Sequence, residues 1–148
     1  MTDHRPVNII MIEDDEGHAR LIEKNIRRAG INNAIKHFVD GGSAIHFLFN
    51  DAAGPVKNGP AMVLLDLNLP DMSGTDILER IKADPALHRT PVVVLTTTDD
   101  KREIDRCYDL GCNVYITKPV NYESFADAIR QLGLFLSVIQ VPEIEGGA

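Results

Sequence analysis

The sequence is poor in cysteine and has no long uninterrupted apolar segment. It contains 2 cysteines in 148 residues, Cys107 and Cys112, and no further ligands at zinc-site spacing lie near them. We therefore expect both to be reduced thiols with a structural role. The most apolar stretch near a terminus, Leu132 to Val141, is too short to cross a bilayer, which needs about 20 apolar residues.

A basic surface and a secretion signal are also absent. The sequence has 15 Lys and Arg residues against 22 Asp and Glu residues, which gives a formal net charge of −7. This balance disfavours binding to nucleic acid and to anionic membranes. The first six residues form no apolar signal core, so we expect a cytoplasmic protein.

What the sequence does contain is a regular alternation of apolar runs and amphipathic segments. The apolar runs predict strands at residues 7–12, 34–38, 61–66, 91–96 and 114–117. The segments after them predict helices at about residues 16–29, 42–50, 73–84 and 99–110, and a last helix from residue 121 onward. Five such units predict an α/β fold, a five-stranded parallel sheet with helices on both faces and right-handed crossovers.

Periodicity also predicts which side chains the first two helices bury. The first helix is expected to bury Ala19, Leu21, Ile22 and Ile26. The second is expected to bury Ala44, Ile45, Leu48 and Phe49. Residues 51–60, which follow, are rich in Gly, Pro, Asn and Ala, and we expect an exposed loop there.

Four of the apolar runs end at residues that can do chemistry. These residues are Glu13 and Asp14, then Asp66, Thr96 and Lys118. In an open parallel sheet, ligands bind at the carboxyl ends of the strands, beside a topological switch point. If these strands are neighbours, the side chains converge. Carboxylates, a hydroxyl and an ammonium group together would form a site for a divalent cation and a phosphoryl group.

Asp66 is the candidate nucleophile of this site. The turn after it is polar and contains Pro70, so we expect the carboxylate to be presented rather than buried. Carboxylates attack phosphoryl groups to give aspartyl phosphates. Neighbouring carboxylates would oppose that attack, and Mg²⁺ would remove the repulsion. Asp14, Asp66 and a backbone carbonyl near Asn68 could supply its oxygen ligands.

The same residues weigh against several other functions. The turn from Glu13 to Gly17 is acidic rather than glycine-rich, which disfavours binding of a dinucleotide or a flavin mononucleotide. A haloacid-dehalogenase-like Mg-dependent phosphatase is an alternative, but its general acid would fall at Asn68, and asparagine cannot transfer a proton. A docking module that is not phosphorylated is a third alternative. Its sign would be the loss of Asp66, Asp14 or Lys118, and all are present.

The sequence resembles the receiver domain of two-component response regulators. The resemblance covers about residues 7–132 and rests on Glu13-Asp14-Asp15, on Asp66 within Leu-Leu-Asp-Leu-Asn-Leu-Pro, and on Gly74, Thr96 and Lys118-Pro119. It implies a flavodoxin-like, doubly wound sheet with strand order 2-1-3-4-5. It also implies that Asp66 is the phospho-acceptor. Asp14, Asp66 and the backbone carbonyl of Asn68 would bind Mg²⁺, with Glu13 acting through water.

The resemblance further implies a switch. A sensor histidine kinase would donate the phosphoryl group, Lys118 and Thr96 would contact it, and the bond between Lys118 and Pro119 would be cis. Thr96 would move inward and Tyr115 would turn into the vacated space. This would change the face formed by residues 99–110, 114–117 and the last helix. Such a protein catalyses only its own phosphorylation and dephosphorylation, so we do not expect an enzyme in the usual sense.

We expect residues 1–148 to form a single receiver domain with a core at about 7–132, an apolar extension at 133–148 and no output domain. Seven large apolar residues lie between Leu132 and Val141, which predicts a homodimer through the last helix and the tail. The alternative is that the tail folds back on its own domain. The long loop, the Thr96-Thr97-Thr98 run and the Leu-rich tail resemble single-domain regulators paired with bacterial phytochrome kinases.

The five histidines are scattered along the chain. They are His4, His18, His37, His46 and His88. None pairs with a cysteine or a second histidine in the sequence, so we expect no metal-binding or catalytic role for them. Of these residues, His18 has the strongest case for such a role, because it lies one turn past the acidic cluster.

Overall fold

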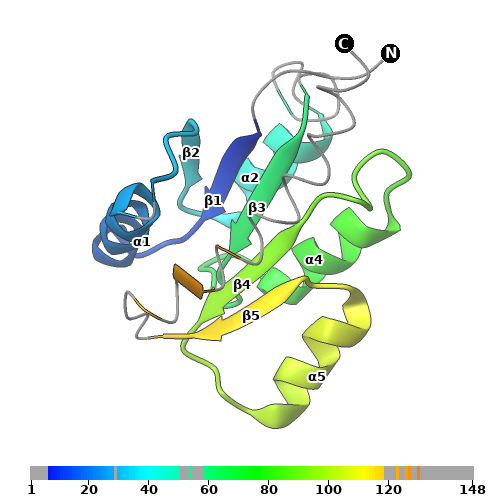
Figure 1. Ribbon diagram of the computed structural model, residues 1–148. Coiled ribbons are helices and arrows are strands. Elements are labelled where there is room, and N and C mark those ends of the chain that lie inside the picture. The colour runs from blue at the N-terminus through cyan, green and yellow to red at the C-terminus, as the bar shows by residue number, and fades with distance from the viewer. Residues whose placement is uncertain are drawn as a thin grey trace.

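The computed structural model describes residues 7–28, 30–50, 54, 59–118, 123, 126, 127 and 130, over which strands and helices alternate (Figure 1). The strands are β1 (Asn8–Ile12), β2 (Ile35–Phe38), β3 (Ala61–Leu65), β4 (Val92–Thr96) and β5 (Val114–Thr117). The helices with full bounds are α1 (Glu16–Arg28), α2 (Gly41–Phe49), α4 (Gly74–Ala83) and α5 (Lys101–Leu110). The four described residues beyond 118 are helical as well, within the predicted last helix.

The strands form one parallel sheet in the order β2-β1-β3-β4-β5. This confirms the predicted α/β fold, its flavodoxin-like strand order and its helices on both faces. The chain crosses from β2 past β1 to reach β3, so the strand order reverses between β1 and β3. A crevice for ligands is expected outside the carboxyl ends of these two strands.

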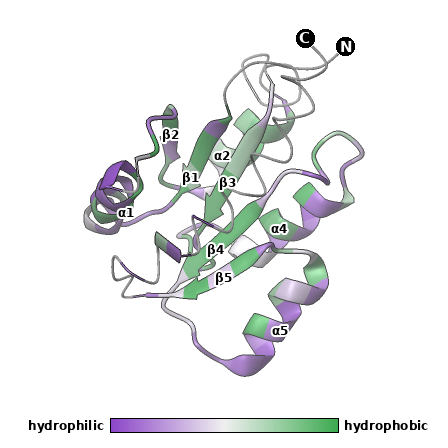
Figure 2. Cartoon of the chain, viewed as in Figure 1, coloured by the Kyte–Doolittle hydropathy of each residue, from purple (hydrophilic) through white to green (hydrophobic). Residues whose placement is uncertain are grey.

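Each face of the sheet has its own hydrophobic core, because successive side chains of a strand point to opposite faces. One face packs against α1 through Ala19, Ile22 and Ile26. The other packs against α2, α4 and α5, with Leu78 and Cys107 among the buried residues. Figure 2 shows hydrophobic strands at the centre and many hydrophilic residues along α1 and α5.

The predicted buried faces of α1 and α2 need corrections, and in α2 Ile45 and Phe49 are only partly buried. Leu21 is 46% exposed, because it is turned by about 100° from its neighbour Ile22, which faces the sheet. Asn25 is buried on that face instead. In α2, Phe47 is buried although it was not predicted to be. Its ring packs against that of Phe38 in β2, with 5.1 Å between the ring centroids.

Aspartate residues set the starts of two helices. The side chain of Asp40 accepts a hydrogen bond from the backbone N–H of Ser43 (2.7 Å) and caps α2. Asp100 accepts one from the backbone N–H of Arg102 (2.8 Å) and caps α5. Because the cap is Asp100, α5 begins at Lys101, two residues later than predicted.

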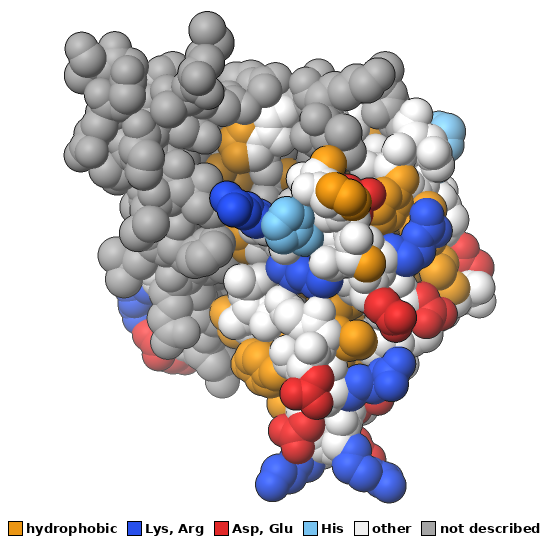
Figure 3. All heavy atoms as spheres, turned by 90° about the vertical axis from the view of Figure 1, so that its right-hand side faces the viewer, with side chains coloured by type: hydrophobic (Ala, Val, Ile, Leu, Met, Phe, Trp, Pro, Cys, Tyr) orange, Lys and Arg blue, Asp and Glu red, His pale blue; other side chains and the backbone are white. Residues whose placement is uncertain are grey.

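Several sequence-based predictions lie outside the described residues. They are the cis bond before Pro119, the tail at 133–148, its role in a dimer, and most of the loop at 51–60, of which Gly54 is buried. Among the described residues, none of the helices combines the length and apolar character needed to cross a membrane. On the face drawn in Figure 3, acidic, basic and apolar side chains are interspersed.

Candidate functional site

The register of β1 and β3 places two predicted site residues side by side. Ile12 pairs with Leu65, so Glu13 and Asp66 each follow the end of a neighbouring strand. The backbone N–H of Asp66 donates to the carbonyl oxygen of Ile12 (3.0 Å), which continues the ladder to this point. The two carboxylates therefore reach the carboxyl edge of the sheet at the same level.

The register of β4 and β5 adds the hydroxyl and the ammonium group to the same edge. Thr96 pairs with Thr117, the last residue of β5. The backbone N–H of Lys118 then donates to the carbonyl oxygen of Thr96 (2.7 Å). Lys118 follows β5 and Asp66 follows β3, with β4 between these two strands. The lysine side chain spans this distance, so that its Nζ lies 3.1 Å from Oδ2 of Asp66. The edge predicted from the sequence is thus assembled from four strands.

Lys118 forms a buried ion-pair network with two carboxylates. Its Nζ contacts Oε1 of Glu13 as well as Oδ2 of Asp66. The lysine side chain is 6% exposed, and Glu13 and Asp66 are 2% and 5% exposed. Burial lowers the pKa of Lys118, but the hydrogen bonds to Glu13 and Asp66 outweigh it, so the pKa is raised. The ammonium group is therefore held in its charged form.

Asp66 is buried, so the prediction that its carboxylate is presented to solvent is wrong. The loop after β3 closes beside the backbone of Asp66, where the backbone N–H of Gly74 donates to the carbonyl oxygen of Leu67 (2.9 Å). Within this loop, Oδ1 of Asp66 accepts a hydrogen bond from the backbone N–H of Asn68 (3.0 Å). Both carboxylate oxygens therefore have a fixed partner, Asn68 on one side and Lys118 on the other.

Three carboxylates meet at this edge. Glu13, Asp14 and Asp66 each offer an oxygen, and these oxygens lie within 4.8 Å of one another. Lys118 is bonded to two of these three carboxylates, so acidic side chains outnumber the lysine in this cluster. Burial raises the pKa of Glu13, although the hydrogen bond from Lys118 works in the other direction. Oxygen donors with excess negative charge fit a hard divalent cation such as Mg²⁺.

Asn68 connects Asp66 to the end of β4. Its side-chain Nδ2 donates to Oγ1 of Thr96 (3.2 Å) and lies 3.4 Å from Oγ1 of Thr97. Because Thr96 accepts this hydrogen bond, the proton of its own hydroxyl is available for another oxygen at the site. The sequence analysis considered only the backbone carbonyl of Asn68 and missed the role of its side chain.

Tyr115, the predicted switch aromatic, contacts the β4–α5 loop rather than the acidic cluster. Its hydroxyl donates to the carbonyl oxygen of Thr98 (2.6 Å), two residues past Thr96. Burial is the largest cause that raises the pKa of the phenol, to about 12. The hydroxyl therefore keeps its proton and can donate at neutral pH. The backbone N–H of Tyr115 donates to the hydroxyl of Tyr108 on α5 (3.1 Å).

Two histidines that the sequence analysis left aside touch the site. Nδ1 of His18 lies 3.1 Å from Nζ of Lys118. Nε2 of His37 lies 2.6 Å from the carbonyl oxygen of Glu13 and holds the backbone of the acidic turn. The position of His18 one turn after the acidic cluster was the sequence signal for its contact. No comparable signal marks His37, which lies on a different strand.

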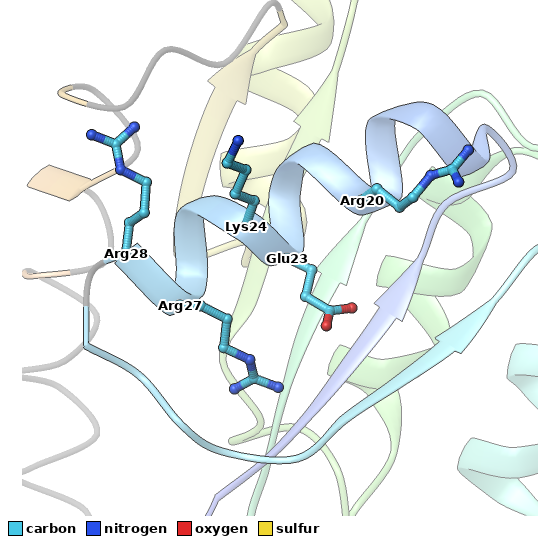
Figure 4. Close-up of a pocket in the computed structure, with 5 residues that line it drawn as sticks. All are labelled: Arg20, Glu23, Lys24, Arg27 and Arg28. Atoms are coloured by element: carbon cyan, nitrogen blue, oxygen red, sulfur yellow. The ribbon is translucent and has the colours of Figure 1, made fainter.

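A hollow on α1 has a different chemistry. It is lined by Arg20, Glu23, Lys24, Arg27 and Arg28 (Figure 4). Nη1 of Arg27 donates to the carbonyl oxygens of Ile31 (3.0 Å) and Asn33 (2.8 Å), which fixes the connection from α1 to β2. The lining is basic and lacks the grouped carboxylates of the sheet edge. The acidic cluster, rather than this hollow, is the candidate site for a cation and a phosphoryl group.

Fold and site together define the class of protein. A doubly wound parallel sheet carries carboxylates, a threonine and a lysine at the carboxyl ends of its central strands and of β5, which is the architecture of a signalling receiver domain. The chain belongs to the response regulator receiver domain family, whose model matches residues 9–130. It is therefore a response regulator of two-component signalling and not a haloacid-dehalogenase-like phosphatase.

Known relatives support this assignment over nearly the whole chain. Response regulator Rcp1 of Synechocystis is 32% identical over 138 residues, which cover 93% of this chain and 94% of Rcp1. A crystal structure of a response regulator receiver domain from Rhodospirillum rubrum has 70% identity and a TM-score of 0.77, and covers 93% of this chain and 98% of that chain.

Two further crystal structures bear on the site. The phosphorylated cyanobacterial phytochrome response regulator RcpA has 33% identity and a TM-score of 0.74, with 88% of this chain and 94% of that chain covered. The Mn²⁺-bound form of Rcp1 has 32% identity and a TM-score of 0.69, with 93% and 92% covered. The predicted similarity to phytochrome response regulators is confirmed.

Proposed function

We propose that this chain is a response regulator that accepts a phosphoryl group on Asp66 from a sensor histidine kinase. Residues 1–148 would form one receiver domain. Mg²⁺ would be held by Asp14, Asp66 and the backbone carbonyl of Asn68, with Glu13 acting through water. The observation that carries the proposal is the buried Asp66 carboxylate, 3.1 Å from the ammonium group of Lys118 and within a cluster of three carboxylates.

In the proposed transfer, a carboxylate oxygen of Asp66 attacks the phosphorus atom of a phosphohistidine. An O–P bond forms, the P–N bond breaks, and the imidazole left on the kinase takes up a proton. The divalent cation would supply charge neutralisation between the carboxylates and the phosphoryl group. Lys118 can donate to a phosphoryl oxygen, because its Nζ is already beside Asp66. Thr96 can donate the hydroxyl proton that its contact with Asn68 leaves available.

We propose that the signal leaves the site through Thr96 and Tyr115. Movement of Thr96 toward a phosphoryl oxygen would pull on the start of the β4–α5 loop. The hydroxyl of Tyr115 is bonded to that loop at Thr98, so the aromatic ring would respond to the movement. A local change of charge would thus bias the surface formed by α5, β5 and the last helix. Apart from its own phosphorylation and dephosphorylation, no catalysis is proposed.

Intact mass spectrometry tests the assignment of Asp66. With Mg²⁺ and acetyl phosphate as a small phosphodonor, the wild type should gain one phosphoryl group and Asp66→Asn should gain none. Asp105→Asn, the same change at an exposed position on α5, should be labelled like the wild type. Labelling of Asp66→Asn at wild-type stoichiometry would show that another residue is the acceptor.

The kinase proposed as donor is of the phytochrome type, which is supported by the similarity to the phytochrome response regulator RcpA. Because such kinases use ATP, the proposed location is the cytoplasm. A purified, phosphorylated phytochrome kinase should transfer its phosphoryl group to this chain faster than an unrelated histidine kinase does. Equal rates from both kinases would contradict this pairing.

The homodimer through the last helix and the apolar tail stays a proposal that rests on the sequence. Polar substitution of both Phe135 and Ile139, which lie four residues apart, should convert dimer to monomer in sedimentation equilibrium. A wild type that is monomeric at high micromolar concentration, with and without phosphorylation, would refute the dimer.

A further inference from the structure

His18 is placed against the lysine of the site, although the chemistry proposed above gives it no part. Its Nδ1 lies 3.1 Å from Nζ of Lys118, and 100 residues separate the two in the sequence. The backbone N–H of His18 donates to Oδ1 of Asp15 (2.9 Å), which holds the residue in the first turn of α1. The backbone of His18 is therefore fixed where its side chain contacts Lys118.

Three acceptors surround the ammonium group of Lys118. They are Oε1 of Glu13, Oδ2 of Asp66 (3.1 Å) and Nδ1 of His18 (3.1 Å). An ammonium group has three N–H donors and no lone pair, so each acceptor takes one donor. His18 must then present the lone pair of Nδ1 to Lys118. An imidazole that accepts at Nδ1 is the tautomer with its hydrogen on Nε2.

A phosphoryl group on Asp66 would bring new oxygen acceptors to a lysine whose donors are all in use. Lys118 must then give up one of its partners. Glu13 is 2% exposed, and a buried acceptor that loses its hydrogen-bond partner cannot be reached by water, which is costly. His18 is exposed, so water can replace Lys118 at its Nδ1. His18 is thus the partner that Lys118 can exchange at least cost.

We propose that His18 is a positioning residue for phosphoryl transfer. It holds the ammonium group of Lys118 beside Asp66 before transfer and yields its place to a phosphoryl oxygen. The inference rests on the proposed phosphorylation of Asp66. It adds a residue from α1 to a site otherwise built from the ends of β1, β3, β4 and β5.

Rescue by a matched amide tests this role. His18→Ala should lower the initial rate of labelling by acetyl phosphate and Mg²⁺ by roughly 3–10-fold, the scale of one charge-assisted hydrogen bond at an exposed site. In His18→Asn, the amide oxygen can take the place of Nδ1 and should restore most of the rate. His18→Gln extends its amide toward the position of Nε2 and should not. His46→Ala, a change of an exposed histidine on α2, should have no effect.

All these variants should keep the wild-type midpoint in urea, because the side chains are exposed. Wild-type labelling together with an unchanged rate in His18→Ala would overturn the role of His18 alone. Rescue by His18→Gln as complete as by His18→Asn would overturn it too. A wild type that accepts no phosphoryl group would overturn the proposed function and the role of His18 with it.

Nitrogen NMR of the imidazole rings gives a second test, which needs no phosphodonor. In the unmodified protein, the His18 ring should carry its proton on Nε2. Addition of Mg²⁺ and beryllofluoride should change the Nδ1 signal of His18 and leave that of His46 unchanged. A ring protonated on Nδ1, or a Nδ1 signal that stays the same while the site binds beryllofluoride, would overturn the inference.

Discussion

Gly74 is the residue whose replacement we expect to affect stability and phosphorylation together. A Cβ atom at this position would lie 2.4 Å from the carbonyl oxygen of Asp66 and 2.7 Å from Cα of Leu67. Ordinary contact begins at 3.4 Å, so the first of these contacts must open by about 1 Å. Both atoms belong to the backbone and cannot rotate away. In Gly74→Ala, α4 and the backbone of Asp66 must therefore separate.

The cost of this overpacking should be about 1–3 kcal/mol of the free energy of unfolding. For a chain of this size, a loss of about 2 kcal/mol lowers Tm by roughly 4–8 °C. Because a shift of about 1 Å at a reacting group can cost up to 100-fold in rate, labelling of Asp66 by acetyl phosphate should slow by at least about tenfold. Urea denaturation and intact mass spectrometry measure the two effects.

Gly42→Ala is the matched control. The added Cβ would meet a carboxylate oxygen of Asp71 at 3.3 Å, which is close to ordinary contact and belongs to a side chain. Alanine is also a better helix former than glycine by roughly 0.5–1 kcal/mol. The control should keep its stability and its labelling rate. If Gly74→Ala also kept both, the steric reasoning would be refuted.

Three further predictions concern the metal site, acid stability and the thiols. Asp14→Ala should weaken Mg²⁺ binding in calorimetric titration by at least about tenfold, and an unchanged Kd would place the metal elsewhere. Asp71 accepts hydrogen bonds from the two backbone N–H groups at the start of α2, which lower its pKa. Its stabilising effect is therefore present above the usual value near pH ~4 and is lost as the pH falls below it. Asp71→Asn should lower the urea midpoint at pH ~7, and its difference from the wild type should shrink as the pH falls below ~4, whereas a difference that stays constant would contradict this. Burial raises the pKa of Cys107 to about 11 and that of Cys112 to about 12, so both should resist a thiol reagent at pH ~8 until the protein unfolds. Rapid labelling of the native protein would contradict the burial.

The fold and the meeting of the site residues could be predicted from the sequence, because both depend on residue type along single elements. An apolar run such as Val92–Thr96 is recognisable as a buried strand in isolation, and the end of such a run is the end of the strand. Carboxyl ends of parallel strands share one edge. The sequence therefore predicts that Asp66 and Lys118 meet, as their contact in the structure confirms.

The contacts that the sequence analysis missed depend on two elements at once. Periodicity describes α1 alone and does not show that its first turn brings His18 to Lys118. Asp66 is buried beside a loop that closes between Leu67 and Gly74, and the polarity of the loop residues contains no information about that closure. The contact between the side chain of Asn68 and Thr96 likewise joins this loop to the end of a different strand, β4. Such contacts are set by packing between elements rather than by local pattern.

The hydroxyl of Tyr108 has a consequence for how this protein behaves in a crowded solution. β5 is an outer strand of the sheet, and an outer strand with unpaired N–H groups is a template for pairing with a foreign chain. Tyr108 reaches across from α5 and accepts one of these hydrogen bonds, that of Tyr115. Among the described residues, an aromatic side chain thus occupies one hydrogen-bonding position at the outer edge of β5. Loss of that single oxygen, in Tyr108→Phe, would favour edge-to-edge aggregation while the fold itself stayed intact.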